Sequence, residues 1–188
     1  MKTMELDTSL LDRAILFAVQ CHSGTERRGK GFPYIVHPME AMAIVATMTS
    51  DQDLLAAAAL HDVVEDTEVT LDEIRTLFGD RVASLVDTES DRLDEGLDWR
   101  ARKEESLKRL KAASREEKIV ALGDKLSNMR AIARDYTSRG EVFWDMFRIK
   151  DKSVHSWRYH ALVDAFSDLY DTYAYQEFEF LVNRIFPQ

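Results

Sequence analysis

The chain has 188 residues, of which 45% are hydrophobic and 31% charged, a composition typical of one globular domain with a sizeable core. Its formal net charge is −9, which disfavours binding of duplex DNA or long RNA, because clustered cations supply most of that affinity. The longest apolar run, Leu54 to Leu60, is too short to span a bilayer, and the 3 Pro and 7 Gly disfavour long linkers and an all-β sandwich.

The N-terminal segment is polar. It carries Glu5 and Asp7 and lacks the hydrophobic core of a secretory signal. The single cysteine, Cys21, cannot form a disulfide within the chain, which agrees with a reducing compartment. We therefore expect a cytoplasmic protein without a membrane anchor, and its oligomeric state stays open.

Apolar residues recur at helical spacing along most of the chain, and no alternating stretch predicts a strand. Thr70 with Glu73, and Ser114 with Glu117, have the spacing of capping boxes that begin helices. Pro38 suits the first turn of a helix. The predicted helices cover residues 10–19, 39–48, 53–64, 71–78, 82–86, 99–113, 115–129 and, as two helices, 154–186.

Two segments interrupt this pattern. Residues 21–33 are polar and contain three glycines, which predicts a loop, and residues 87–98 are acidic and of unclear structure. The helix starting at Leu54 is apolar all round, so we expect it at the centre of the core. The predicted fold is an all-α orthogonal bundle of about eight to ten helices, forming a single domain over residues 1–188.

The strongest chemical signal is the hexapeptide that begins with His61 and Asp62 and ends with Glu65 and Asp66. Adjacent residues point about 100° apart on a helix, but both can reach one ion beside a helix end. Glu65 follows Asp62 by three residues, so a second carboxylate lies on the same face. Burying such groups without a partner is costly, which favours a bound cation. The alternative is a solvated helix terminus.

Two more residues extend this signal. His37 lies just before a predicted helix start, and Asp124 lies on an otherwise apolar helix. Taken alone, His37 could be an ordinary loop histidine, and Asp124 could pair with Lys125 or Arg130. Two imidazoles with two carboxylates suit Mn²⁺ or Fe²⁺ and argue against a thiolate zinc site.

Together, these residues resemble the H…HD…D pattern of the HD superfamily of metal-dependent phosphohydrolases. More narrowly, the segments PYIVHP, ALHDVVEDT, FGDRVASLV and GDKLSNMR resemble the hydrolase domain of RelA/SpoT proteins and the stand-alone small alarmone hydrolases, including the metazoan SpoT homologue type. The resemblance covers about residues 10–130.

The resemblance implies a role for each matching residue. It implies water activation by Glu65 and Asp66, substrate positioning by Asn128, and a bound metal, which in family members is typically Mn²⁺. The implied metal ligands are His37, His61, Asp62 and Asp124, and the implied nucleotide and phosphate contacts lie on the loop segment Arg27-Arg28-Gly29.

The basic loop also indicates phosphate binding by itself, because Arg27, Arg28 and Lys30 form a group of cations in an acidic chain, before His37. Guanidinium groups bind phosphate through two hydrogen bonds and can stack on a base. The alternative is a solvated, flexible loop.

The chain departs from the family pattern at a few positions. Gly123 stands where Ala is usual, and residues 87–92 lack the "VTKL"-like run of the long enzymes. The family's aromatic residue beside the nucleotide has no secure match. The candidates are His155, Trp157 and Tyr159, although Trp157 and Tyr159 also suit the core.

We therefore expect a (p)ppGpp 3′-pyrophosphohydrolase of the stringent response, which releases pyrophosphate and GDP or GTP from a small nucleotide. The first alternative is hydrolysis of another nucleotide, such as (p)ppApp, NADPH or a nucleoside monophosphate, because an HD site does not select the base. The second is a non-catalytic nucleotide sensor, which would not need the pair Glu65 and Asp66.

Overall fold

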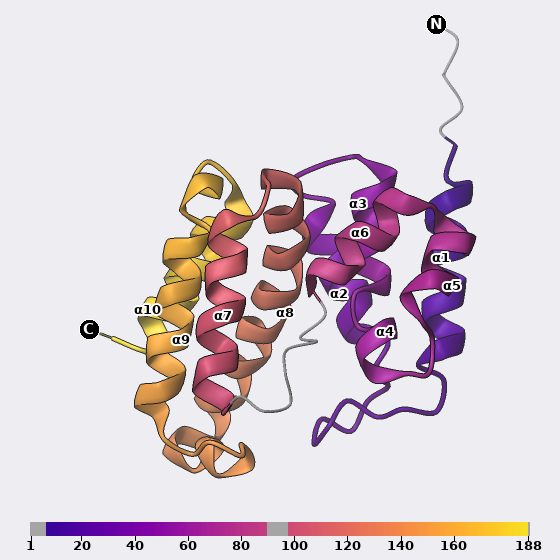
Figure 1. The fold of residues 1–188 in the computed structure, drawn as a ribbon. Coiled ribbons are helices and arrows are strands. Elements are labelled where there is room, and N and C mark those ends of the chain that lie inside the picture. Colours follow the sequence, from indigo (N-terminus) through magenta and orange to yellow (C-terminus); the bar gives the residue numbers. More distant parts are fainter. Residues whose placement is uncertain (1–6, 90–97, 188) are drawn as a thin grey trace, which may run out of the picture. The chain divides into compact units, whose positions relative to one another are not determined.

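The structure is a computed structural model that describes residues 7–89 and 98–187 (Figure 1). Within these ranges the chain forms helices and no strand, apart from one isolated bridge between Glu26 and Pro33. The predicted all-α fold class is confirmed. None of the helices in the described ranges is long and apolar enough to cross a membrane.

The chain divides into two compact units, Met1–Ser90 and Asp91–Gln188. The organisation of residues 1–188 as a single domain stays a prediction. The acidic segment of unclear structure lies mostly outside the described residues, at 90–97.

The first unit is built around its most apolar helix, α3, which packs against α1, α2 and α6 (Figure 1). Every residue from Leu54 to Leu60 is buried, as expected for a helix that is apolar all round. The helices of this unit are α1 (Ser9–Cys21), α2 (Val36–Val45), α3 (Gln52–Leu60), α4 (Val63–Asp66), α5 (Leu71–Phe78) and α6 (Asp80–Glu89).

Helix α3 ends earlier than the periodicity predicts, at Leu60 instead of Val64. In a continuing helix, the Ala58 carbonyl would accept a hydrogen bond from the N–H of Asp62. In the structure, Nδ1 of His61 lies 2.8 Å from this carbonyl oxygen, so the imidazole competes for it. His61 and Asp62 therefore form a turn between α3 and α4.

Helix boundaries elsewhere follow local capping chemistry. Both predicted capping boxes are present, with Thr70 and Ser114 accepting hydrogen bonds from the backbone three residues later. Helix α5 ends at Gly79, whose φ of 93° suits glycine. Pro38 is the third residue of α2, within its first turn.

The second unit packs its long helix α8 against α10 and against two short 3₁₀ helices, and packs α7 against α9 (Figure 1). Phe143, Phe166, Phe178 and Phe186 are fully or almost fully buried in its core. The C-terminal segment forms two α-helices, as predicted. The helices are α7 (Trp99–Ala112), α8 (Arg115–Arg139), η1 (Gly140–Met146), α9 (Lys152–Ala165), η2 (Ser167–Leu169) and α10 (Tyr173–Ile185).

Candidate metal centre

Three of the four predicted metal ligands converge in the first unit. Nε2 of His61 lies 2.9 Å from Oδ2 of Asp62 and 3.3 Å from Nε2 of His37. Nε2 of His37 lies 3.4 Å from the same Asp62 oxygen. The two imidazoles are almost completely buried, and the aspartate is half-buried.

These distances fit one face of an octahedral ion. Ligand atoms about 2.1 Å from an ion at adjacent corners lie about 3.0 Å apart. The observed spacings of 2.9, 3.3 and 3.4 Å are close to this value. A face of two imidazoles and one carboxylate leaves further positions open, which suits a divalent transition metal that also binds water or a phosphate oxygen.

Secondary structure orients both imidazoles. A carbonyl oxygen can only accept, so the contact with Ala58 places the hydrogen of His61 on Nδ1 and gives Nε2 the lone pair that a metal ligand needs. His37 is the second residue of α2, and its backbone N–H donates to the Tyr34 carbonyl at 2.9 Å. Packing of α2 on α3 then brings the two rings together, with centroids 5.0 Å apart.

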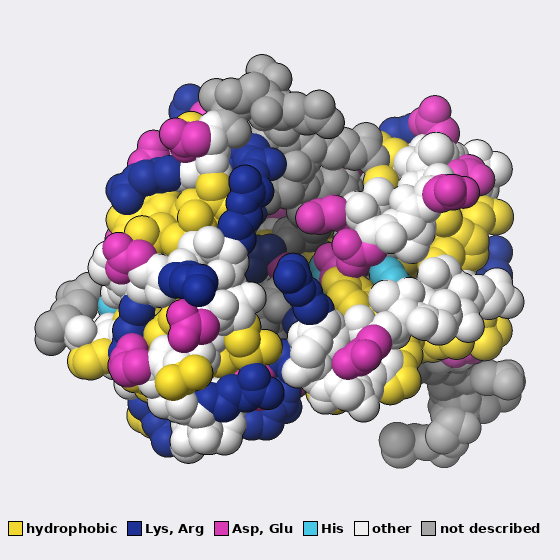
Figure 2. Space-filling view, turned by 90° about the horizontal axis from the view of Figure 1, so that it is seen from below, with side chains coloured by type: hydrophobic (Ala, Val, Ile, Leu, Met, Phe, Trp, Pro, Cys, Tyr) yellow, Lys and Arg dark blue, Asp and Glu magenta, His cyan; other side chains and the backbone are white. Residues whose placement is uncertain are grey.

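The predicted water-activating residues, Glu65 and Asp66, lie on the short helix α4, directly after the turn that holds two of the ligands. Both residues are exposed. On the face seen in Figure 2, histidine reaches the surface beside acidic side chains. Carboxylates that solvent can reach therefore follow the predicted ligand His61 by four and five residues in the chain.

The predicted phosphate-binding residues lie on a loop that folds back on itself. The backbone N–H of Arg27 donates to the Phe32 carbonyl at 3.0 Å, and that of Lys30 donates to the Arg27 carbonyl at 2.9 Å. Gly29 and Gly31 take positive φ values of 69° and 72°, which the tight reversal requires. The loop has a defined conformation, and Arg27, Arg28 and Lys30 all lie on it.

Sequence reasoning missed two residues beside the ligands, Tyr34 and His22. The Tyr34 hydroxyl donates to Oδ2 of Asp62 at 2.7 Å. Burial and then the Asp62 charge raise the pKa of Tyr34, so its hydroxyl remains a donor. The buried His22 ring lies 4.9 Å from the Tyr34 ring, and burial lowers the pKa of His22. The signal in the sequence that could have indicated Tyr34 was its position, three residues before the predicted ligand His37.

The fourth predicted ligand, Asp124, lies in the second unit, on α8. Its buried carboxylate accepts hydrogen bonds from Lys125 and from Asn128, one turn later. The ion pair with Lys125 matches the alternative interpretation of Asp124, and its role as a metal ligand stays a prediction. Asn128, predicted to position substrate, orients this carboxylate in the structure.

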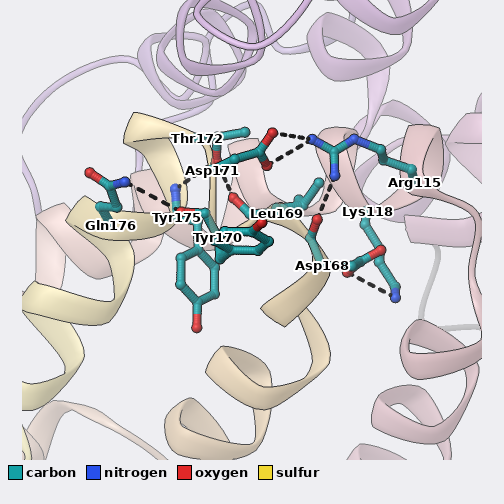
Figure 3. A network of polar contacts seen from close by, with 9 residues as sticks. All are labelled: Arg115, Lys118, Asp168, Leu169, Tyr170, Asp171, Thr172, Tyr175 and Gln176. Atoms are coloured by element: carbon teal, nitrogen blue, oxygen red, sulfur yellow. Dashed lines mark hydrogen bonds and ion pairs between the residues drawn. The ribbon is translucent and has the colours of Figure 1, made fainter.

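The start of α8 is held by a network of charged side chains (Figure 3). Nζ of Lys118 lies 3.1 Å from Oδ1 of Asp168, and the Arg115 guanidinium binds the Asp171 carboxylate at 2.9 Å. Arg115 also donates to the Asp168 carbonyl. The network joins α8 to the segment around η2 and so fixes the helix that carries Asp124.

The second unit also contains a cavity of about 180 Å³. His155 and Tyr159, two of the candidates for stacking on a base, line it, whereas Trp157 instead lies under the Arg100 guanidinium, 4.2 Å from it. Tyr159 also stacks on Phe186 in the core. The lining residues are Trp99, Ile132, Phe147, Arg148, Ile149, His155, Arg158 and Tyr159.

Comparison with known families gives one match that covers most of the chain. The model of the HD domain family matches residues 14–147. This range includes all the predicted metal ligands.

Relatives with assigned names agree with this match. The chain is 38% identical over 133 residues to the GTP pyrophosphokinase rsh of Brucella ovis, covering 68% of this chain and 18% of that protein. It is 33% identical over 127 residues to the guanosine-3′,5′-bis(diphosphate) 3′-pyrophosphohydrolase of Aquifex aeolicus, covering 65% and 18%. The chain thus spans less than a fifth of the length of these curated relatives.

Solved structures extend the similarity to nearly the whole chain. A metazoan orthologue of SpoT, described as hydrolysing ppGpp, superimposes with a TM-score of 0.74 at 25% identity, covering 97% of both chains. The protein lmo0812 of Listeria monocytogenes superimposes with a TM-score of 0.72 at 28% identity, covering 81% of this chain and 99% of that one.

Proposed function

The chain belongs to the HD domain family, and from this premise we propose that it is a metal-dependent phosphohydrolase that cleaves the 3′-diphosphate of (p)ppGpp. The products would be pyrophosphate and GDP or GTP. One observation carries the proposal: His37, His61 and Asp62 converge within 3.4 Å of one another, directly before an exposed acidic pair.

The proposed metal is Mn²⁺, with Fe²⁺ as the alternative. When bound, the ion would supply positive charge beside the phosphate and lower the pKa of a water molecule. His37, His61 and Asp62 would hold it through two nitrogens and one oxygen, with Asp124 as the predicted fourth ligand.

The remaining polar residues would act on water and on substrate. We assign the removal of a proton from the attacking water to the Glu65 carboxylate, which solvent can reach, with Asp66 beside it. Asn128 would act on substrate either directly or through the Asp124 carboxylate that it orients.

Arg27, Arg28 and Lys30 would bind the phosphates. The guanidinium carbon of Arg27 lies 5.5 Å from the centroid of the Tyr34 ring, which supports the side chain at the base of the loop. Charge-assisted hydrogen bonds from such a cluster attract a polyphosphate to a chain whose net charge is −9.

The names of the relatives support ppGpp as the substrate. An HD metal site acts on phosphorus and does not select a base, so (p)ppApp, NADPH and nucleoside monophosphates belong in the same assay. The proposed place of action is the cytoplasm, in line with the single cysteine.

The test is incubation of the protein with Mn²⁺ and a panel of these nucleotides, with products separated by chromatography. The proposal expects pyrophosphate and GDP from ppGpp. Orthophosphate as the product would indicate a terminal phosphatase. Faster turnover of another nucleotide would identify that nucleotide, and not ppGpp, as the substrate. Tight binding of ppGpp without turnover would indicate a sensor.

A further inference from the structure

We infer that Tyr34 is a positioning residue of the metal centre, where its hydroxyl holds the Asp62 carboxylate and its ring supports Arg27 of the phosphate-binding loop. The inference rests on the proposed function, because it assumes that Asp62 is a metal ligand and that Arg27 contacts substrate.

The hydrogen bond from Tyr34 reaches the oxygen that faces the other ligands. The hydroxyl lies 2.7 Å from Oδ2 of Asp62, and this same oxygen lies 2.9 Å from Nε2 of His61 and 3.4 Å from Nε2 of His37. A carboxylate oxygen has two lone pairs, so it can accept the phenol hydrogen and still face an ion. The phenol therefore selects which oxygen of Asp62 is directed at the centre.

Tyr34 is itself fixed to the loop and to helix α2. Its backbone N–H donates to the Thr25 carbonyl at 2.8 Å, and its own carbonyl accepts from the N–H of His37 at 2.9 Å. The His22 ring packs against it at 4.9 Å. These contacts fix the backbone of Tyr34 on both sides and pack its ring, so the hydroxyl can act as a rigid donor.

The ring and the hydroxyl have separable tasks. The Arg27 guanidinium carbon lies 5.5 Å from the ring centroid, a contact that needs the ring and not the hydroxyl. The Asp62 contact needs the hydroxyl. Hydrogen bonds that orient a metal ligand typically change metal affinity about 10–100-fold when they are removed.

The experiment compares Tyr34→Phe and Tyr34→Leu with the wild-type protein. Mn²⁺ affinity is measured on metal-free protein by electron paramagnetic resonance of unbound Mn²⁺, without substrate. Tyr34→Phe should weaken Mn²⁺ binding about 10–100-fold and, at saturating Mn²⁺, leave KM for ppGpp close to that of the wild type. Tyr34→Leu should weaken Mn²⁺ binding similarly and also raise KM, because Arg27 loses its support.

Tyr175→Phe is the matched control. The Tyr175 ring is also largely buried, and its hydroxyl lies 3.4 Å from Oε1 of Glu179, but both residues lie on α10, outside the predicted site. This variant should bind Mn²⁺ with wild-type affinity.

Wild-type Mn²⁺ affinity in Tyr34→Phe would overturn the inference and leave the proposed function standing. Equal weakening in Tyr34→Phe and Tyr175→Phe would also overturn it, since the loss would then reflect general destabilisation. A wild-type protein that binds no Mn²⁺ would overturn the metal centre and the inference with it.

Discussion

Mn²⁺ should stabilise the folded protein, and the His61→Ala variant should lose this effect. The three ligand atoms already lie 2.9–3.4 Å apart, so an ion can bind without rearranging their side chains. The unfolded chain lacks this arrangement, and a ligand that binds only the folded state raises its stability by mass action. His61→Ala removes the central imidazole of the cluster and leaves only His37 and Asp62 of its three converging ligands.

The size of the effect follows from saturation. At a free Mn²⁺ concentration of about 100 times Kd, the added stability is about 2.7 kcal/mol. For a chain of this length, 1 kcal/mol shifts Tm by about 2–4 °C, so Mn²⁺ should raise Tm by about 5–11 °C. In His61→Ala the increment should fall to nearly zero.

Differential scanning calorimetry of metal-free protein, with and without Mn²⁺, measures this increment. His160→Ala is the control, because Nε2 of His160 lies 3.0 Å from the Phe186 carbonyl in the second unit and has no predicted metal role. Its own Tm can fall, but its Mn²⁺ increment should match that of the wild type. If His61→Ala keeps the full increment, the ion binds elsewhere and the assigned centre is wrong.

Three further predictions concern substrate, chemistry and acid stability. Replacing Arg27 and Arg28 together by Ala should raise KM for ppGpp about tenfold or more, since a charge-assisted hydrogen bond contributes about 1.5–3 kcal/mol. An unchanged KM would show that the loop is solvated surface without contact to substrate. Glu65→Gln should lower kcat about 10²–10⁴-fold with Mn²⁺ binding retained, and loss of the metal would instead make Glu65 a ligand. Burial lowers the pKa of His155 below the 6.5 of an ordinary histidine, so below pH 6.5 the folded state binds fewer protons than the unfolded state. The free energy of unfolding therefore falls as the pH drops below 6.5, by at most about 1.4 kcal/mol per pH unit. Denaturation of His155→Asn at pH 7.5 and 5.5 should show a smaller fall than the wild type, and an equal fall would refute this.

The helices were predictable because their determinants are local. The capping boxes at Thr70 and Ser114 lie within four residues of sequence, and both are present in the structure. The apolar composition of α3 also predicted its central place, since a helix without a polar face has to be covered by other helices.

The candidate site was predictable only in part. His61 and Asp62 are adjacent in sequence, and their pairing with His37 followed from the family resemblance. The contact of Tyr34 with Asp62 joins residues 28 positions apart, and the segment PYIV gives little sign that its phenol is a donor to a carboxylate. Such contacts depend on how α2 packs on α3, which periodicity does not specify.

The length of α3 was predicted wrongly, and this error concerns the feature that forms the site. In a continuing helix, the side chains of His61 and Asp62 would point about 100° apart. The helix instead ends at Leu60, and in the turn that follows Nε2 of His61 and Oδ2 of Asp62 approach to 2.9 Å. The His61 contact with the Ala58 carbonyl both interrupts the helical hydrogen bonding and directs Nε2 toward His37. One side chain thus ends the helix and, in the proposed centre, binds the metal, whereas the spacing of apolar residues extends the helix through Val64 because it carries no signal for this side-chain contact.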